Sequence, residues 1–371
     1  MTASTARFVG MFTPLLLLAQ MGSAQTTPGT SRYALTNLGT LGGKYVEVEA
    51  MNDRGQIIGM AEFPGDTQWA HGYLWQKGKM KELPRFQPLG INDDGQIVGV
   101  RTDLRAVLYR QGRISPLSSH TGHSLEGAEE AKAINSQGQG VGWAIFYTSS
   151  GPHDVAVLWR NGEAQALNTE PAKVSRSEAI AVNRLGETVG TAGFPPLPDS
   201  NPNVPWTDHV VLWRDGKMLD LGVPKGFQET DKPAFNNRGQ VVLEADAYRP
   251  NSAGKHGSFL WEAGHFTPLS PPPGFRYTDV YAINDSGLIV GDIETASFQK
   301  HAAIWKNGRA IDLNSLIPAG SGWVLQQAKA VNNRGQIAGE GTFHGQSRAF
   351  LLTPLMRRSV SARACAGIHF L

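Results

Sequence analysis

The chain has 371 residues and a formal net charge of +2, from 34 Lys and Arg against 32 Asp and Glu, with no long run of either sign. Proteins that bind nucleic acids usually gather basic residues on one face, so this balance argues against a nucleic-acid partner. The single cysteine, Cys365, excludes a disulfide within the chain even in an oxidising compartment. The 43 Gly and 22 Pro are typical of many short strands separated by turns.

The first 24 residues have the pattern of a secretory signal peptide. Arg7 supplies the positive start, residues 11–19 are mostly apolar, and Gly22-Ser-Ala24 provides small residues for cleavage. A membrane-spanning helix needs about 20 apolar residues, and this segment is too short to be one. We therefore predict a mature chain that begins near Gln25, lacks a membrane span and is extracytoplasmic, either secreted or periplasmic.

A motif of the form Ala-Ile-Asn-Asp-Ser-Gly-Leu-Ile-Val-Gly, taken here from Ala282 to Gly291, occurs in seven versions. Asn suits the first position of a type I turn, and Gly takes the left-handed conformation that follows it. The Asn-x-x-Gly sequence therefore predicts a tight hairpin with a bulge. The repeat Asn residues stand 40 to 53 residues apart, at Asn52, Asn92, Asn135, Asn183, Asn236, Asn284 and Asn332.

A second signature follows each turn. It is an aromatic strand that ends in two polar residues and Gly, as in Val157-Leu-Trp-Arg-Asn-Gly162, followed by a short segment that closes on Leu. Each unit therefore contains four short strands, which we name A to D. Five of the nine Trp share one place in strand C, which indicates packing between sheets; they are Trp75, Trp159, Trp213, Trp261 and Trp305.

Repeats of this length with four strands are what β-propeller blades require. The last copy lacks a clear fourth strand, and Tyr33–Gly39 at the other end matches the D strands of the other copies. We therefore predict an all-β, seven-bladed β-propeller of four-stranded blades, closed by the N-terminal strand as the outer strand of the last blade. The domain spans residues 25–354, residues 355–371 form a non-repeat tail, and we expect a monomer. An open solenoid is the structural alternative.

The repeated turns, Leu38-Gly-Thr-Leu-Gly-Gly43 and Arg348-Ala-Phe350 resemble the HAF-repeat family of bacterial extracellular repeat proteins. The resemblance covers about residues 33–353 and recurs in every unit. It implies an exported repeat protein and brings no catalytic residues with it. The sequence departs from the pattern at Leu243, which replaces Gly, at Tyr109 and Leu352, which replace Trp, and at Gly140, which interrupts the third B strand.

The strand order assigns the A–B and C–D turns to one face of the predicted ring and the B–C and D–A loops to the other. Loops of variable length on a rigid scaffold commonly carry function, so the second face is the candidate surface for an unknown protein or glycan. The aromatic residues predicted to contact a ligand there are Trp69, Tyr147, Trp206, Tyr248, Tyr277 and Trp323. The alternative is that these rings pack onto their own loops.

Histidines and turn carboxylates give little sign of a metal site. His71, His209 and His301 lie four residues before a strand-C Trp in separate blades, so we expect each to bond a loop carbonyl group. His120 and His123 form a close pair without identifiable further ligands. The Asn-Asp-x-Gly turns offer too few carboxylates for calcium. The sequence therefore predicts no metal and no cofactor.

Paired carboxylates are the remaining candidates for chemistry. Glu47 with Glu49 and Glu129 with Glu130 are such pairs, and we expect only Glu47 and Glu49 to face the channel. A glycosidase needs two carboxyl groups about 5–10 Å apart. The chain has no Gly-x-Ser-x-Gly elbow, phosphate-binding Gly loop or His-Glu-x-x-His motif. We assign no catalytic residue and favour an exported binding or scaffolding propeller, with a carbohydrate-active hydrolase or lyase at the channel mouth as the alternative.

Overall fold

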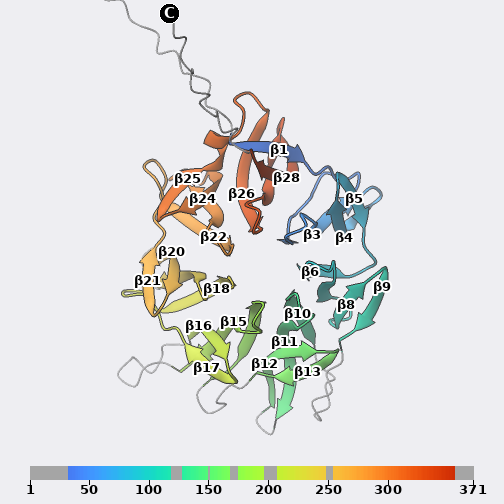
Figure 1. The fold of residues 1–371 in the computed structure, drawn as a ribbon, viewed down its shortest axis with the longest axis vertical. Coiled ribbons are helices and arrows are strands. Elements are labelled where there is room, and N and C mark those ends of the chain that lie inside the picture. Colours follow the sequence, from blue (N-terminus) through green and yellow to red (C-terminus); the bar gives the residue numbers. More distant parts are fainter. Residues whose placement is uncertain are drawn as a thin grey trace, which may run out of the picture.

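A computed structural model describes residues 32–117, 128–148, 151–167, 174–195, 207–247 and 254–355. These residues form seven four-stranded antiparallel sheets arranged as blades around one axis (Figure 1). The seven-bladed, all-β propeller predicted from the repeats is therefore confirmed. Within these ranges, no helix is long and apolar enough to cross a membrane. The predicted signal peptide (1–24) and the tail from residue 356 onward lie outside the described residues.

We number the blades by their repeat Asn, from blade one at Asn52 to blade seven at Asn332. The innermost strands, A, are β2 (Ala50–Met51), β6 (Gln87–Ile91), β10 (Glu129–Ile134), β14 (Ser177–Val182), β18 (Glu229–Phe235), β22 (Tyr277–Ile283) and β26 (Trp323–Val331). The B strands are β3 (Ile57–Phe63), β7 (Ile97–Val100), β11 (Gly140–Thr148), β15 (Thr188–Phe194), β19 (Val241–Ala247), β23 (Ile289–Glu294) and β27 (Ile337–Phe343).

The two outer layers complete each blade. The C strands are β4 (Asp66–Gln76), β8 (Ala106–Arg110), β12 (Gly151–Arg160), β16 (Thr207–Arg214), β20 (Lys255–Glu262), β24 (Lys300–Lys306) and β28 (Gln346–Pro354). The D strands are β5 (Lys79–Glu82), β9 (Arg113–Pro116), β13 (Glu163–Ala166), β17 (Lys217–Asp220), β21 (His265–Pro268), β25 (Arg309–Asp312) and, in blade seven, β1 (Tyr33–Asn37). A short 3-10 helix, η1 (Leu313–Leu316), follows β25.

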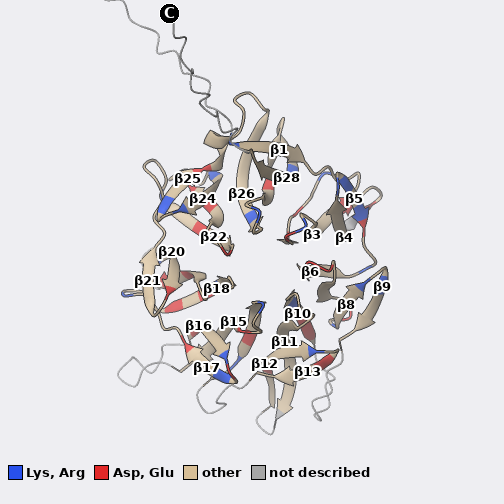
Figure 2. Ribbon diagram, viewed as in Figure 1, with Lys and Arg blue, Asp and Glu red and all other residues tan. Residues whose placement is uncertain are grey.

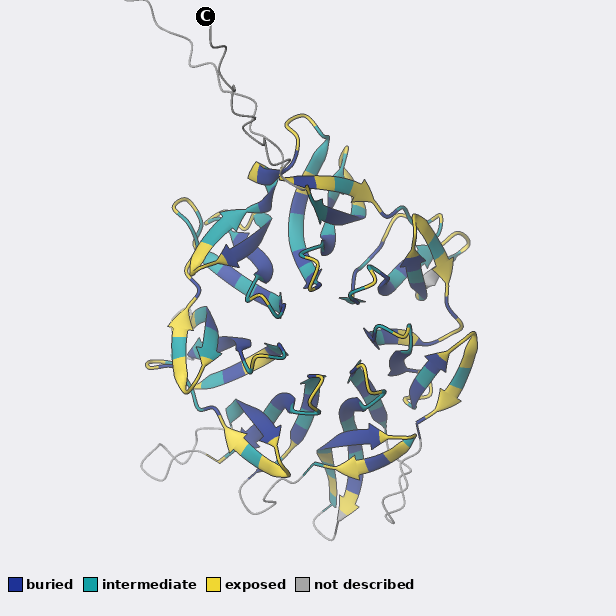
Figure 3. Ribbon diagram, in the orientation of Figure 1, coloured by how far each residue is buried: buried dark blue, intermediate teal, exposed yellow. Residues whose placement is uncertain are grey.

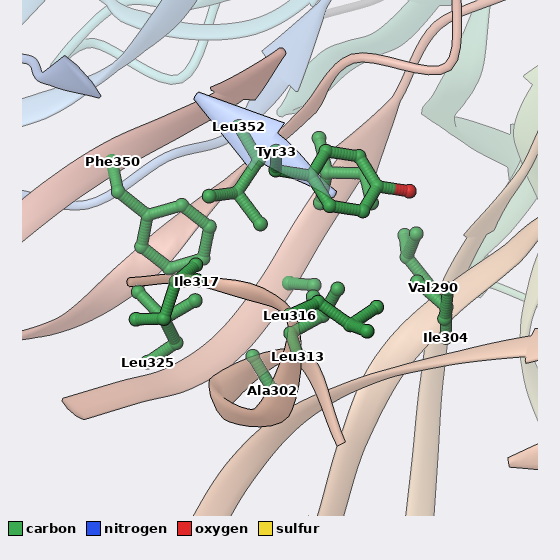
Figure 4. Close-up of a cluster of buried hydrophobic side chains, with 12 residues drawn as sticks. Tyr33, Val290, Ala302, Ile304, Leu313, Leu316, Ile317, Leu325, Phe350 and Leu352 are labelled. Atoms are coloured by element: carbon green, nitrogen blue, oxygen red, sulfur yellow. The ribbon is translucent and has the colours of Figure 1, made fainter. Parts of the chain in front are cut away.

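Blade seven joins the two ends of the described chain. Strand β1 pairs antiparallel with β28, from Tyr33 opposite Pro354 to Asn37 opposite Phe350. Figure 4 shows the Tyr33 ring beside Leu352 in a buried apolar cluster that also takes side chains from blade six and η1. The predicted closure is therefore confirmed. The pairing completes the last blade, so its third strand does not become an open sheet edge.

The hydrophobic core is divided into layers between neighbouring blades, as Figure 3 shows by the buried segments inside the ring and the exposed outer strands. The repeated strand-C aromatic fills these layers. Trp159 and Trp305 are each 1% exposed, and Trp213 is 3% exposed. The prediction that this Trp position serves packing is thus supported by the structure, because large rings in repeated, dry gaps contribute mainly through buried area.

The repeat Asn does more than form its own turn. Asn284 Oδ1 accepts from the backbone N–H groups of Ser286 and Leu288, which builds the predicted turn, and Gly287 follows with φ of 79°. Its Nδ2 donates to the carbonyl oxygen of Asn332 in the next blade, 2.9 Å away. Six of the seven repeat Asn side chains make this inter-blade bond, on Asn92, Asn135, Asn183, Asn284, Asn332 and Asn52 in turn.

The Gly that ends most copies of the motif has a steric cause. In blade three a Cβ on Gly142 would overlap the carbonyl oxygen of Glu130 on the neighbouring inner strand. The inner strand carries a bulge there, between Ala131 and Ala133, which pushes its backbone towards β11. Equivalent overlaps occur at the matching Gly of five other blades, Gly59, Gly99, Gly190, Gly291 and Gly339.

Candidate functional site

The two ends of the inner strands differ in character. At one end, which we call the turn end, the seven Asn-x-x-Gly turns line a cavity of about 200 Å³. Its polar groups are used by the ring itself. For example, Asp285 accepts from Asn237 and Asn333, and Asp53 accepts from the N–H group of Asn333. The turn end is therefore a structural feature that the repeats share.

The opposite end of the inner strands carries carboxyl groups. Five residues before the repeat Asn, five of the seven blades have an acid, namely Glu47, Glu130, Glu178, Asp231 and Asp279. Eight residues after the repeat Asn, only blades five to seven have one, namely Glu244, Asp292 and Glu340. These eight residues and Glu49 define what we call the acidic end. Figure 2, viewed down the axis of the ring, shows Asp and Glu on strands around its centre.

Blade five departs from the repeat where the acidic end is most crowded. Leu243 stands in place of the close-approach Gly, and it fits because the inner strand shifts register between Asp231 and Ala234. Lys232 takes a left-handed conformation in that bulge, with φ of 49°. Its Nζ then lies 2.7 Å from Oε2 of Glu244, which is 2% exposed. The exception noted in the sequence thus positions an ion pair beside the channel.

His256 lies between two carboxylates at the seam of blades five and six. Its Nε2 is 3.1 Å from Asp279 Oδ1, and its Nδ1 is 2.9 Å from Asp246 Oδ1. The hydrogen bond to Asp279, against the opposing effect of burial, raises the pKa of His256 to about 9. Burial alone would raise the pKa of Asp279, but His256 and Lys300 outweigh it and lower that pKa to about 2. The pair is therefore ionic at neutral pH.

Asp292 is 1% exposed and lies at the centre of blade six's charged groups. Its Oδ2 accepts from Tyr281 Oη at 2.8 Å and from Gln327 Nε2 at 3.1 Å. Lys300 Nζ lies 3.1 Å from Asp279 Oδ2 and 3.4 Å from Asp292 Oδ2. Burial, together with the charge of Asp279, raises the pKa of Asp292. The Tyr281 pKa is raised by burial and then by Asp292.

Blades seven and one contribute a second group of acids. Glu340 Oε1 accepts from the Val48 N–H group at 2.8 Å, and burial raises the pKa of Glu340. The Glu49 side chain reaches solvent, but many protein atoms also surround it. The desolvation that these atoms cause raises the pKa of Glu49 to about 7; the charge of Lys329 opposes the shift, and that of Glu47 adds to it. Glu49 can therefore give or accept a proton near neutral pH.

The six aromatic residues predicted to bind a ligand do not form one described surface. Tyr147 on β11 is 51% exposed, whereas Tyr277 on β22 is half-buried. Trp323 on β26 packs against Phe343 and Phe350, with ring centroids 5.3 and 6.0 Å away. Their blades are three, six and seven. Trp206, Tyr248 and the side chain of Trp69 lie outside the described residues.

Two expectations about charged residues need correction. His71, His209 and His301 do not bond loop carbonyl groups; each bonds an acid eleven residues later on strand D, namely Glu82, Asp220 and Asp312. Strand pairing makes this possible because β-hairpins place such residues side by side. Glu47 and Glu49 are also not alone at the channel, since Glu130 occupies the position equivalent to Glu47. His120 and His123 lie outside the described residues.

Four residues at or beside the acidic end were not among those predicted from the sequence, namely His256, Glu244, Asp279 and Asp292. For Glu244 and Asp292 the signal was present, because aligning the seven copies on their Asn shows acids eight positions later only in blades five to seven. Residues that every copy shares are explained by packing. The positions where single copies depart from the rest were the informative ones.

No protein-family model and no curated protein matches this sequence. Among solved structures, the chain is similar to the β-propeller domain of the Trilobed protease from Pyrococcus furiosus, at a TM-score of 0.52 and 10% identity, over 86% of this chain and 98% of that one. It is also similar to a puromycin-hydrolyzing peptidase of Mycobacterium tuberculosis, at a TM-score of 0.53 and 10% identity, over 85% of this chain and 52% of that one. The chain thus spans about half the length of that peptidase. These likenesses establish the propeller fold.

Proposed function

We propose that this chain is an exported, monomeric binding propeller whose acidic end receives a positively charged segment of a partner protein. The observation that carries the proposal is the excess of acid at one end of the ring. The acidic end has nine carboxyl groups, and the ammonium groups among them are those of Lys132, Lys232, Lys300 and Lys329. Three of these acids, Glu244, Asp292 and Glu340, stand at a repeat position where the other four blades have no acid.

The contacts within the acidic end support this choice of ligand. Lys132 Nζ lies 2.6 Å from Glu178 and 3.3 Å from Glu130, so an ammonium group already bridges two blades at this end. A Lys or Arg side chain of a partner would find equivalent carboxylates at Glu47 and Asp231, which the structure leaves partly or fully exposed. Charge of one sign on a protein surface also speeds association with a partner of the opposite sign.

The test is a titration of the protein with a short Lys-rich peptide and with a Glu-rich peptide of the same length. We expect the Lys-rich peptide alone to bind, with an affinity that falls as salt rises. Glu47→Gln combined with Asp231→Asn should weaken it at least tenfold. Asp94→Asn, at an exposed acid of the turn end, is the matched control and should leave binding unchanged. Equal binding of both peptides, or equal effects of the two sets of variants, would overturn the proposal.

A second candidate, a carbohydrate-active hydrolase or lyase, is favoured by Glu49. Its pKa of about 7 is that of a general acid that works at neutral pH, and Glu340 lies on the adjacent blade seven, with Tyr281 one blade further on. The wild-type protein would be assayed against a panel of aryl glycosides and acidic polysaccharides. Turnover that is lost in Glu49→Gln and kept in Glu62→Gln would support this function. A protein that turns over no member of the panel contradicts it.

Export is also a proposal, supported by the signal-peptide pattern of residues 1–24 and by the resemblance to HAF-repeat proteins. Fusing these residues to a reporter that is active only outside the cytoplasm tests it directly. Replacing Leu15-Leu-Leu-Leu18 by alternating Asn and Ser is the control, because it removes the apolar core of the signal. Reporter activity that does not depend on that core would contradict export through this segment.

A further inference from the structure

We propose that Glu244, His256 and Asp279 bind one divalent transition-metal ion, Zn²⁺ or Mn²⁺, at the seam between blades five and six. The three residues come from β19 and β20 of blade five and β22 of blade six, so these two blades must pack together before they meet. One ligand atom from each lies within 4.8 Å of the other two. Glu244 and Asp279 are two of the nine acids of the acidic end, but the proposal does not rest on the peptide-binding function, because the metal needs only these two acids and His256.

The geometry of His256 is that of a metal ligand. Its Nε2 lies 3.1 Å from Asp279 Oδ1. Two ligands that each bind zinc at about 2.0–2.2 Å lie about 3–3.5 Å apart, so these two atoms already have the required separation. The other ring nitrogen, Nδ1, lies 2.9 Å from Asp246 Oδ1. A carboxylate behind the ring in this way holds the hydrogen on Nδ1, so a metal that displaces the Nε2 proton of the imidazolium meets the Nε2 lone pair.

Glu244 supplies the independent observation. The side chain is 2% exposed, and its Oε1 atom is buried without a hydrogen-bond partner. Its Oε2 atom, by contrast, accepts from Lys232 Nζ at 2.7 Å. A buried carboxylate oxygen with no partner is costly, and such atoms are rare in native proteins. A metal ion beside His256 and Asp279 would give this oxygen the partner it lacks.

Two lysines are close enough to compete with a cation, but each contacts only one oxygen of its carboxylate. Lys232 contacts Oε2 of Glu244, and Lys300 contacts Oδ2 of Asp279, whose other oxygen, Oδ1, faces His256 Nε2. Lys300 also lies within 3.8 Å of Asp292 and Glu294. The seam therefore has the five carboxyl groups of Glu244, Asp246, Asp279, Asp292 and Glu294 against two ammonium groups. The excess of negative charge favours a divalent cation.

The donor set decides the class of metal. One imidazole nitrogen and two carboxylate oxygens suit Zn²⁺ or Mn²⁺, whereas Ca²⁺ and Mg²⁺ prefer oxygen ligands alone and Cu⁺ prefers sulfur. The side chains of His256 and Asp279 are 25% and 24% exposed. Water can therefore reach the ion and complete its coordination, which is the arrangement of metal sites that exchange a ligand.

The test uses the full mature chain, stripped with a chelator and titrated with Zn²⁺, Mn²⁺, Ca²⁺ and Mg²⁺ in separate calorimetric experiments. We expect one equivalent of Zn²⁺ or Mn²⁺ to bind and to raise the melting temperature, and Ca²⁺ and Mg²⁺ to bind at least tenfold more weakly. Cobalt gives a second readout, because Co²⁺ in a site with nitrogen and oxygen ligands absorbs visible light. Wild-type protein that binds neither ion and gives no cobalt spectrum would overturn the proposal.

Variants locate the site. His256→Asn and Glu244→Gln should each weaken binding at least tenfold, provided that circular dichroism shows the fold retained. His301→Asn is the matched control, because His301 also pairs with a carboxylate, that of Asp312 at 2.7 Å, yet belongs to no such cluster. If a variant does not fold, competition between Co²⁺ and Zn²⁺ on the wild type still decides whether a site exists. Equal loss in His301→Asn would show binding elsewhere and reject this site.

Glu47→Gln with Asp231→Asn separates the two proposals, since it should impair peptide binding and leave metal binding intact.

Discussion

The turn end and the acidic end are built on the same seven inner strands, yet they follow opposite rules. At the turn end each repeat Asn satisfies its own turn and bonds the next blade, so one copy depends on its neighbour. At the acidic end blades five to seven carry acids that blades one to four lack at the matching position. A contact that every blade junction needs must be repeated in every copy, whereas a contact found at a single junction is free to differ. The residues that all copies share therefore build the ring, and the residues that differ between copies form the candidate site.

The largest expected effect comes from breaking the turn end. Asn135→Ala removes two turn bonds, to the N–H groups of Gln137 and Gln139, and the inter-blade bond to the Asn183 carbonyl at 2.9 Å. With each buried hydrogen bond worth about 1 kcal/mol, we expect the free energy of unfolding to fall by about 3–4 kcal/mol. Denaturant titration measures it. Asn161→Gly, at an exposed turn with φ of 53°, should cost less than about 0.5 kcal/mol. Equal losses in the two variants would show that neither the turn bonds nor the inter-blade bond of Asn135 contributes to stability.

The next effect tests the close approach of strands A and B. Gly142→Ala places a methyl group against the Glu130 carbonyl, and overpacking of this kind costs about 2–3 kcal/mol of unfolding free energy. Two residues away in the same strand, Gly140 has its nearest neighbour, Trp159, at 3.8 Å from a built Cβ. Gly140→Ala should therefore be neutral or stabilising by up to about 1 kcal/mol. Thermal melts of the pair decide it, and a destabilised Gly140→Ala would contradict the steric account.

A smaller effect at the acidic end depends on pH. In metal-free protein the folded pKa of His256 is raised from 6.5 to about 9, so its stabilisation is complete below pH 6.5 and is lost as pH rises through 9. The folded pKa of Asp279 is lowered from 3.8 to about 2, so its contribution is present above pH 3.8 and is lost as pH falls through 2. The pair should contribute most between about pH 4 and 6.5.

His256→Asn tests this pH dependence. The wild type should lose about 2 kcal/mol of unfolding free energy between pH 6.5 and 9.5, a figure reduced for a side chain that is one quarter exposed. The variant should lose much less over the same range. Denaturant midpoints measured at four pH values in the presence of a chelator provide the data. Parallel curves for the two proteins would mean that the imidazolium pair does not stabilise the fold.

The smallest effect concerns Glu49 and has the opposite sign. Its folded pKa of about 7 exceeds the usual 4.5, so ionisation opposes folding and stability falls as pH rises from 4.5 through 7. Glu49→Gln should remove this penalty and raise the free energy of unfolding at pH 8 by about 1 kcal/mol, since solvent screens an accessible side chain. Carbon-detected NMR titration of the Glu49 carboxyl checks the pKa itself. A midpoint near 4.5 would remove both the stability effect and the case for a general acid.

The sequence predicted the fold because the fold depends on what the copies share. Asn, Gly and the strand-C Trp recur for reasons of hydrogen bonding, steric contact and packing, and the match of Tyr33–Gly39 to the D strands predicted closure. The site was harder to predict because it depends on what single copies change. Leu243 was noted as a departure, but its partner is the register shift around Lys232, which only coordinates reveal. The seam that joins Glu244 to Asp279 is likewise a product of ring geometry and not of spacing along the chain.

The pairing of β1 with β28 also governs how the molecule is assembled. Strand β1, the first in the described part of the chain, cannot find its partner until β28 has been made. Its docking therefore joins segments that are very far apart in the sequence. Such contacts form slowly because the chain must first lose the entropy of a very large loop. Until then β28 is an edge that a neighbouring molecule's β1 can occupy equally well. Concentrated refolding should therefore yield domain-swapped dimers that exchange this one strand.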